Sequence, residues 1–215
     1  MVKLDVGAAS ELISALTARG YKAYAVGGCV RDLLCGKKPC DYDIATSALP
    51  DEVAEVFAGQ KVIGTGLKHG TVTVIVGGKP YEITTFRKDG DYADGRRPDS
   101  VQFVGDIVGD LSRRDFTVNA MAYNDEDGLI DPFGGEADLK NKILRCVGEP
   151  ERRFKEDALR ILRAVRFCAV CGFTPEENTV NAATRLRDGL KRVSAERIFA
   201  ELNKTLLGDY VVGAL

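Results

Sequence analysis

Two aspartates separated by one residue carry the strongest chemical signal in the sequence. Asp41 and Asp43 lie in the segment DYDIAT (41–46), which predicts a β-strand. Because side chains alternate along a strand, both carboxylates should point to the same face. Such a pair can hold two Mg²⁺ ions about 4 Å apart, which activate an attacking hydroxyl and neutralise a leaving phosphate. A lone DxD is more often a solvated strand face, so the neighbouring residues decide.

A glycine pair precedes the aspartates. Residues 21–26 predict a short strand, Gly27 and Gly28 a turn, and residues 30–34 a short helix. Without side chains in the turn, backbone N–H groups can approach a triphosphate, and a helix N-terminus favours anions. Arg31 lies one turn into the helix, within reach of phosphate or ribose. A glycine pair alone marks many ordinary turns, but strand, turn, helix and DxD in this order are a rarer combination.

A second polar face is predicted near residue 160. The segment 151–170 has the longest helical periodicity in the chain. At 100° per residue, Glu156, Asp157, Arg160 and Arg163 fall within roughly 120° of arc, and apolar residues face the other way. Many charged helices share this pattern, with Glu156 and Arg160 as an ordinary i,i+4 pair.

These candidate groups need a sheet to position them. Residues 71–76 and 81–86 alternate β-forming residues around GGKP and predict a hairpin, so the sheet should have at least four strands. On the second hairpin strand, Glu82 alternates with Thr84 and Phe86. It is either a third carboxylate beside the aspartate pair or a plain surface glutamate.

The remaining pattern indicates an α+β chain with two domains. Helices are predicted over residues 8–19 and from Pro50 to Phe57, and from about residue 148 the pattern becomes wholly helical. We therefore expect a mixed β-sheet domain flanked by helices over residues 1–147, followed by an all-α domain over residues 148–215.

Composition excludes several function classes. The single histidine, His69, makes a Ser-His-Asp triad or a histidine metal site hard to build, so catalysis should rest on carboxylates. Six cysteines in a chain of 215 residues with 45% hydrophobic residues fit reduced thiols better than a disulfide framework. No run of eighteen apolar residues occurs, so we expect a soluble, cytoplasmic protein without a membrane segment. The net charge is −2, but residues 140–170 contain nine Lys or Arg against four acids, which suggests a localised polyanion site.

Six motifs in this order resemble one known family. They are GGCVRD with DYDIATSA, RRDFTVNAMAY (113–123), DPFGG (131–135), EDALRILR (156–163) and SAERIFAEL (194–202). Together they resemble the class II CCA-adding enzyme and bacterial poly(A) polymerase family, within the DNA polymerase β nucleotidyltransferase superfamily. The resemblance runs over almost the whole chain. It implies a nucleotidyltransferase head over residues 1–147 and a helical neck over residues 148–215 that recognises the nucleotide base.

The resemblance also implies residue roles. In the head, Asp41 and Asp43 would be Mg²⁺ ligands and catalytic residues, with Glu82 as a further catalytic candidate. The nucleotide-binding residues that it implies are Gly28, Arg31, Arg114, Asp115, Asn119, Asp157, Arg160, Arg163 and Arg166. Gly28 and Arg31 would contact the triphosphate, whereas the motif at 113–123 would serve the ribose and domain coupling. Arg166 lies off the polar arc of its helix.

The neck has a chemical logic of its own. Cytosine and adenine both present an amino donor beside a ring-nitrogen acceptor, so Asp157 could accept from the amino group while Arg160 donates to the ring nitrogen. Uracil and guanine reverse both groups and would leave buried charges unpaired, a mismatch that can reject them by about 10⁴-fold. Protein side chains would then choose C and A without a nucleic-acid template.

The implied function is the addition of C, C and A to the 3′ end of tRNA from CTP and ATP. The charged loop 87–100 looks full length, whereas CC-adding relatives have it shortened, which favours addition of both C and A. Alternatives are a poly(A) polymerase, a CC- or A-adding relative, or a nucleotide-binding fragment with weak RNA activity. Family members usually continue into body and tail domains that hold the tRNA, and this chain appears without them.

Overall fold

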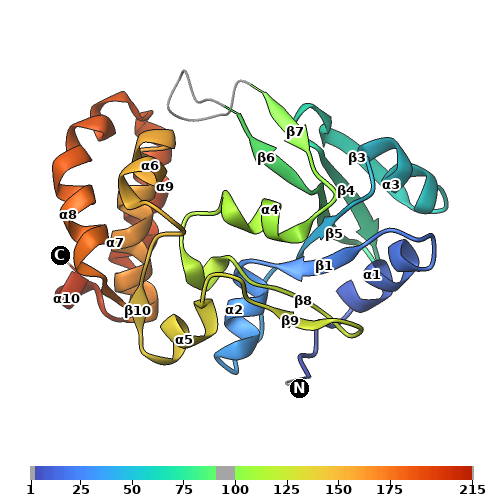
Figure 1. Ribbon diagram of the computed structural model, residues 1–215, viewed down its shortest axis with the longest axis horizontal. Coiled ribbons are helices and arrows are strands. Elements are labelled where there is room, and N and C mark those ends of the chain that lie inside the picture. The colour runs from blue at the N-terminus through green and yellow to red at the C-terminus, as the bar shows by residue number, and fades with distance from the viewer. Residues whose placement is uncertain (1–2, 91–99, 215) are drawn as a thin grey trace. The chain divides into compact units, whose positions relative to one another are not determined.

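The computed structural model describes residues 3–90 and 100–214, and these form two compact units (Figure 1). The first unit consists of the described residues within Met1–Lys88, Val101–Arg114 and Asn119–Glu136. The second unit takes those of Asp89–Ser100, Asp115–Val118 and Ala137–Leu215. The functional division into a head of residues 1–147 and a neck of residues 148–215 stays a prediction.

A seven-stranded mixed sheet forms the centre of the first unit, in the order β3-β4-β5-β2-β1-β8-β9. Its strands are β1 Ala23–Val26, β2 Asp43–Thr46, β3 Lys61–Gly66, β4 Thr71–Val76, β5 Lys79–Thr85, β8 Ala122–Asn124 and β9 Gly128–Ile130. Strands β2 and β5 run parallel, and the other neighbours run antiparallel. The mixed sheet and the hairpin β4–β5 are confirmed, whereas β3, β8 and β9 were not foreseen.

Two helices cover one face of this sheet (Figure 1). Helix α1 (Ala9–Thr17) buries Leu12, Ile13 and Leu16, the residues at helical spacing, and α3 (Pro50–Val56) buries Val53. Along β5, Tyr81 and Ile83 are buried while Glu82 is exposed. The strand alternation therefore turns Glu82 away from the apolar layer.

Short elements complete the first unit. They are α2 Gly28–Leu34, η1 Leu67–His69, β6 Arg87–Asp89, β7 Val101–Phe103 and α4 Ile107–Ser112. The short helix η2 (Thr117–Asn119) has Thr117 and Val118 in the second unit and Asn119 in the first. The expectation of a loop over residues 87–100 is wrong at its start, since β6 (Arg87–Asp89) pairs with β7, which follows the predicted loop, in a two-stranded sheet. A ladder uses backbone groups, so polar side chains do not prevent it. Residues 91–99 lie outside the described residues, so the loop-length criterion stays a prediction.

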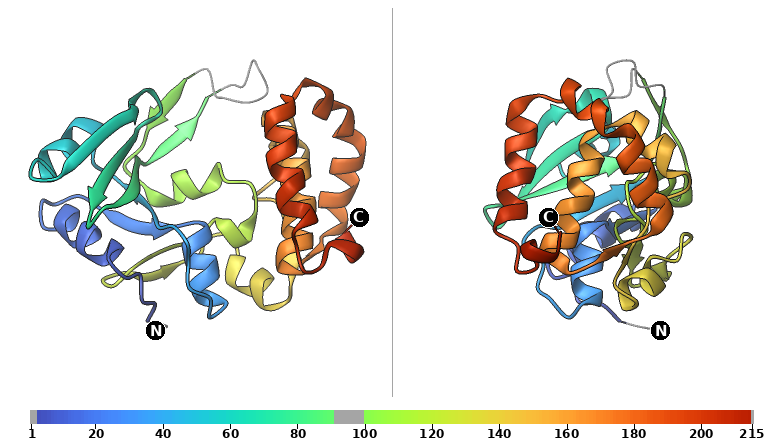
Figure 2. Two further views of the ribbon diagram at one scale, coloured as in Figure 1. Left: turned by 180° about the vertical axis from the view of Figure 1, so that it is seen from behind. Right: turned by 90° about the vertical axis from the view of Figure 1, so that its left-hand side faces the viewer.

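Packed helices make up most of the second unit (Figure 2). They are α5 Gly135–Lys140, α6 Pro150–Glu156, α7 Leu159–Cys171, α8 Glu177–Leu186, η3 Arg187–Arg192, α9 Ala195–Leu206 and α10 Val211–Ala214. Helix α7 packs on α9, and α6 packs on α8. The pattern is not wholly helical as expected, because β11 (Thr174–Pro175) pairs in parallel with β10 (Ile143–Leu144).

The predicted continuous helix over residues 151–170 is wrong. Asp157 has an extended backbone, with φ −147° and ψ 107°, and separates α6 from α7. Its Oδ1 accepts a hydrogen bond from the Leu159 N–H at 3.0 Å, so the side chain competes with the helical backbone and starts the next helix. The helical arc calculated across this position therefore does not hold.

The structure describes the state of the cysteines and the lengths of the helices. All six cysteines are free thiols. Among the described residues, the structure has no helix that is both long and apolar enough to cross a membrane.

Candidate active site

The two aspartates lie at the start of β2, in the first unit. The strand begins at Asp43, with Asp41 just before it, and both side chains are exposed. Burial by the surrounding protein has the largest effect on the pKa of Asp43 and raises it. Arg114 lowers this pKa and Asp41 raises it, and the net pKa lies above the ordinary value. Asp41 is thus close enough to Asp43 to raise its pKa, and the role of the pair as a metal site stays a prediction.

Glu82 is the direct neighbour of Asp43 on the adjacent strand. The parallel register of β2 and β5 pairs the two residues, and both are exposed. However, no group of three or more His, Cys, Asp and Glu that could hold a metal ion exists in the part of the chain that the structure describes. Glu82 as a third carboxylate stays a prediction.

The glycine turn after β1 is flanked by two guanidinium groups. Gly27 has φ +75°, and a Cβ built there would lie 2.8 Å from Nη1 of Arg114. A Cβ on Gly28 would lie 3.6 Å from Nη2 of Arg31. Arg31 Nη1 donates to Asn119 Oδ1 at 2.6 Å, so the structure brings together three of the sequence-predicted nucleotide-binding side chains with Gly28. Each guanidinium also pairs with a carboxylate, Arg31 with Asp32 at 2.7 Å and Arg114 with Asp110 at 3.2 Å.

We expect Gly27→Ala to weaken nucleotide binding about tenfold or more, because the new methyl group displaces the Arg114 guanidinium, which carries a charge-assisted contact. Gly20 offers a matched control, since it also has a positive φ, +86°, but no atom within 4 Å of a built Cβ. Both substitutions should lower the melting temperature through backbone strain. Isothermal titration with CTP checks this, and equal losses of affinity in the two variants would contradict it.

Asp110 is a buried carboxylate that the sequence analysis did not single out. It lies on α4, its side chain is 1% exposed, and its Oδ1 accepts from Arg113 Nε at 3.0 Å and Nη2 at 2.8 Å. Its Oδ2 accepts from Arg114 Nη2 at 3.2 Å, and the backbone N–H of Arg87 donates to Oδ1 at 3.3 Å. The spacing of three and four residues before the two arginines was the available signal.

The pKa of Asp110 predicts a pH-dependent stability. Burial alone would raise this pKa, but Arg113 and Arg114 outweigh it and hold the pKa below 3.8, the ordinary value. The ionised carboxylate therefore contributes stability above about pH 4, which is lost as the pH falls through the lowered pKa. Asp110→Asn should lower the melting temperature at pH 7, and the difference from the unsubstituted protein should shrink toward pH 3. Thermal melts across this range check it, and a constant difference would contradict it.

Asp115, Arg163 and Arg166 belong to an ion-pair network in the second unit. Arg163 Nη2 lies 2.6 Å from Asp115 Oδ2, and this carboxylate raises the pKa of Arg163. Arg166 Nε lies 2.5 Å from Glu201 Oε2, and its guanidinium sits 4.1 Å from the ring centroid of Phe167. These partners hold both arginines in place, and their contact with a nucleotide stays a prediction.

The two proposed base-reading residues each have a different partner. Arg197 Nη2 on α9 donates to Asp157 Oδ2 at 2.7 Å. Arg160 Nη1 donates to Glu156 Oε2 at 2.6 Å, as the i,i+4 spacing predicts, and to the Arg153 carbonyl at 3.1 Å. A carboxylate and a guanidinium, three residues apart at the break between α6 and α7, are thus both positioned by neighbours.

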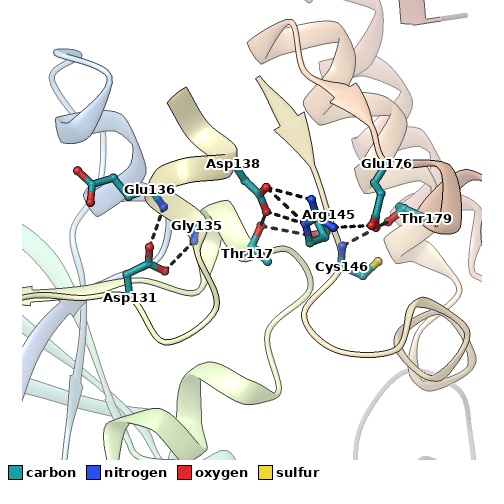
Figure 3. Close-up of polar contacts among 9 residues, drawn as sticks. All are labelled: Thr117, Asp131, Gly135, Glu136, Asp138, Arg145, Cys146, Glu176 and Thr179. Carbon is teal, nitrogen blue, oxygen red and sulfur yellow. Dashed lines mark hydrogen bonds and ion pairs between the residues drawn. The ribbon is translucent and has the colours of Figure 1, made fainter. Parts of the chain in front are cut away.

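A polar cluster holds the segment that contains Asp115 (Figure 3). Thr117 Oγ1 donates to Asp138 Oδ2 at 2.7 Å, and the Thr117 N–H donates to the Arg145 carbonyl at 2.9 Å. Arg145 pairs with Asp138 at 3.1 Å and also with Glu176 at the N-terminal end of α8. Within the second unit, these bonds fix the segment next to Asp115, and the sequence analysis missed them because their members are far apart along the chain.

The DPFGG motif has a local structural role, also visible in Figure 3. Asp131 accepts from the Gly135 N–H at 2.7 Å and from the Glu136 N–H at 2.9 Å. Its carboxylate therefore satisfies the free N–H groups at the start of α5.

Comparison with known proteins adds the family. Residues 23–145 match the family model described as the Poly A polymerase head domain. Residues 172–215 match the model described as a probable RNA and SrmB-binding site of polymerase A. A CCA-adding enzyme of Oceanobacillus iheyensis is 50% identical over 207 residues, 96% of this chain and 51% of that relative.

Solved structures agree with the sequence relatives. The Bacillus stearothermophilus CCA-adding enzyme in complex with CTP matches with a TM-score of 0.87 and 48% identity, over 96% of this chain and 50% of that one. The Thermotoga maritima CCA-adding enzyme complexed with tRNA matches with a TM-score of 0.79 and 32% identity, over 95% and 48%. The chain spans about half the length of the curated relatives it matches. The head-domain model covers more than half of the residues. This chain belongs to the Poly A polymerase head domain family, and nearly all of it is similar to CCA-adding enzymes.

Proposed function

We propose that this chain carries the nucleotide-adding machinery of a CCA-adding tRNA nucleotidyltransferase, which adds C, C and A to the 3′ end of tRNA from CTP and ATP. The observation that carries the proposal is the placement of Asp41 and Asp43, at the start of β2, beside a glycine turn flanked by Arg31 and Arg114. Carboxylates supply metal ligands, and the guanidinium groups supply triphosphate contacts. The names of the similar proteins support CTP and tRNA as ligands.

The donor set suits Mg²⁺ on chemical grounds. Asp41 and Asp43 offer hard oxygen donors on an exposed strand end, with room for water and phosphate oxygens in the remaining positions. A raised pKa at Asp43, caused by surrounding protein and Asp41, is the electrostatic strain that a divalent cation would relieve. When bound, the metal would lower the pKa of the primer hydroxyl and neutralise charge on the reacting phosphate.

The groups of the chain itself would do the remaining work. Arg31 would bind the triphosphate beside the Gly27 turn, and Asn119, which accepts from Arg31, would hold that guanidinium in place. Arg114, for which the resemblance implied a role at the ribose, packs on the same turn and would bind the triphosphate instead. In the second unit, Asp157 would accept from the amino group of cytosine or adenine and Arg160 would donate to the ring nitrogen. Base choice would then depend on the hydrogen bonds that hold these two side chains.

A poly(A) polymerase is the second candidate function. The matched family model carries that name, and every group described above suits ATP as well as CTP. The two functions differ in their use of CTP and in product length.

Equilibrium binding of each nucleoside triphosphate in Mg²⁺ tests the proposal. Titration calorimetry should show CTP and ATP binding with similar affinity, and UTP and GTP at least about 10²-fold more weakly, since each mismatched base leaves two polar contacts unmet. Binding of ATP alone would favour the poly(A) polymerase. Equal binding of all four would show that the neck residues do not select the base.

A further inference from the structure

We propose that Asp110 is a positioning residue, which holds the guanidinium of Arg114 against the Gly27 turn so that Arg114 contacts the triphosphate. This inference rests on the proposed function and concerns the same site. It assigns a role to a carboxylate that does not itself touch the substrate. Every group that it involves lies in the first unit.

Asp110 and two arginines form a largely buried cluster of charges. Asp110 is 1% exposed, and it accepts from two guanidinium groups, those of Arg113 and Arg114, which are 18% and 20% exposed. Asp110 thus holds two guanidinium groups, and the partly exposed one of Arg114 can also face an anion.

The two arginines differ in the hydrogen bonds that they donate to Asp110. Arg113 gives Asp110 two hydrogen bonds, from Nε and Nη2, both to Oδ1. Arg114 gives one, from Nη2 to Oδ2 at 3.2 Å. The other end of the Arg114 guanidinium, Nη1, lies at the Gly27 turn.

Arg114 lies at the Gly27 turn. A Cβ built on Gly27 would lie 2.8 Å from Nη1 of Arg114, so the guanidinium packs directly on the glycine backbone. Its charge also lowers the pKa of Asp43, which places it within electrostatic reach of the aspartate pair. The ion pair between its Nη2 and Asp110 helps to hold the side chain there and offsets the rotamer entropy that a fixed arginine loses.

A double-mutant cycle with CTP and with inorganic tripolyphosphate tests the inference on the full chain. Asp110→Asn keeps the shape of the side chain but removes its charge, and it should weaken binding of both probes about tenfold. In an Arg114→Ala background, the same substitution should change affinity less than about twofold, because there is no guanidinium left to position. In an Arg113→Ala background, the tenfold loss should persist.

Asp110→Glu separates positioning from stability. The extra methylene overpacks a site that is 1% exposed, so the melting temperature should fall, yet the retained charge should keep CTP affinity within about threefold. If affinity instead follows the melting temperature across the Asn and Glu variants, Asp110 is merely structural and the inference is wrong. If Asp110→Asn weakens binding equally with and without Arg114, it is also wrong. A chain that binds neither probe would overturn the proposed function itself.

Discussion

Asp41→Asn and Asp43→Asn are each expected to lower the rate of nucleotide addition by about 10³-fold or more, because metal ions contribute several kcal/mol of transition-state stabilisation. The measurement is a single-turnover incorporation of labelled CTP in Mg²⁺. The melting temperature should not fall in Asp43→Asn, since the ionised carboxylate is disfavoured by surrounding protein and by Asp41. Loss of activity without loss of stability is the signature of a functional carboxylate.

Substitutions of two further carboxylates serve as comparisons for the two aspartate variants. Glu55→Gln, on the exposed face of α3, should leave the rate unchanged and serves as the matched control. Glu82→Gln decides the role of the neighbour of Asp43 on β5: a loss as large as that of Asp43→Asn would identify a third ligand. Retention of the full rate in Asp43→Asn would contradict the account of the metal site.

Asp157→Asn is expected to lower the discrimination of CTP over UTP by about 10-fold to 10²-fold, because an amide can present either an acceptor or a donor to the base. Asparagine can keep Oδ1 as the acceptor of the Leu159 N–H, so the start of α7 should be preserved, whereas its NH₂ group replaces the Oδ2 that accepts from Arg197 Nη2. Competition between labelled CTP and UTP measures the ratio directly.

The control for this second prediction is Asp188→Asn, which removes an exposed carboxylate of η3 in the same unit. It should leave the CTP to UTP ratio unchanged. An unchanged ratio in Asp157→Asn would remove Asp157 from base recognition. Arg160 would then carry the selection alone or not at all.

Local pattern predicted the first helices and strands of the first unit and the hairpin β4–β5, but not β3, β8 or β9. Alternation predicted β2, β4 and β5, and the spacing of Leu12, Ile13 and Leu16 predicted α1. These signals work because each depends on residues close along the chain and on burial against one layer. The same reasoning placed both aspartates beside the glycine turn and Arg31.

Non-local features could not be predicted in this way. The break at Asp157 arises from a side chain that caps the next helix and pairs with Arg197, forty residues later. The polyanion site expected from the basic residues of 140–170 stays a prediction, but the pairing of Arg145, Arg163 and Arg166 with acids outside that segment was not predicted. Pairing across distant segments depends on the tertiary fold, which charge counts along a sequence do not contain.

The most direct test of the central proposal is the product ladder on a tRNA that lacks its 3′ CCA. The chain is incubated with Mg²⁺ and each labelled triphosphate, singly and together, and products are resolved to one nucleotide. The account predicts two C additions followed by one A, and none in the Asp41→Ala/Asp43→Ala double variant. Long tails from ATP alone, or incorporation of U and G as readily as C, would contradict it.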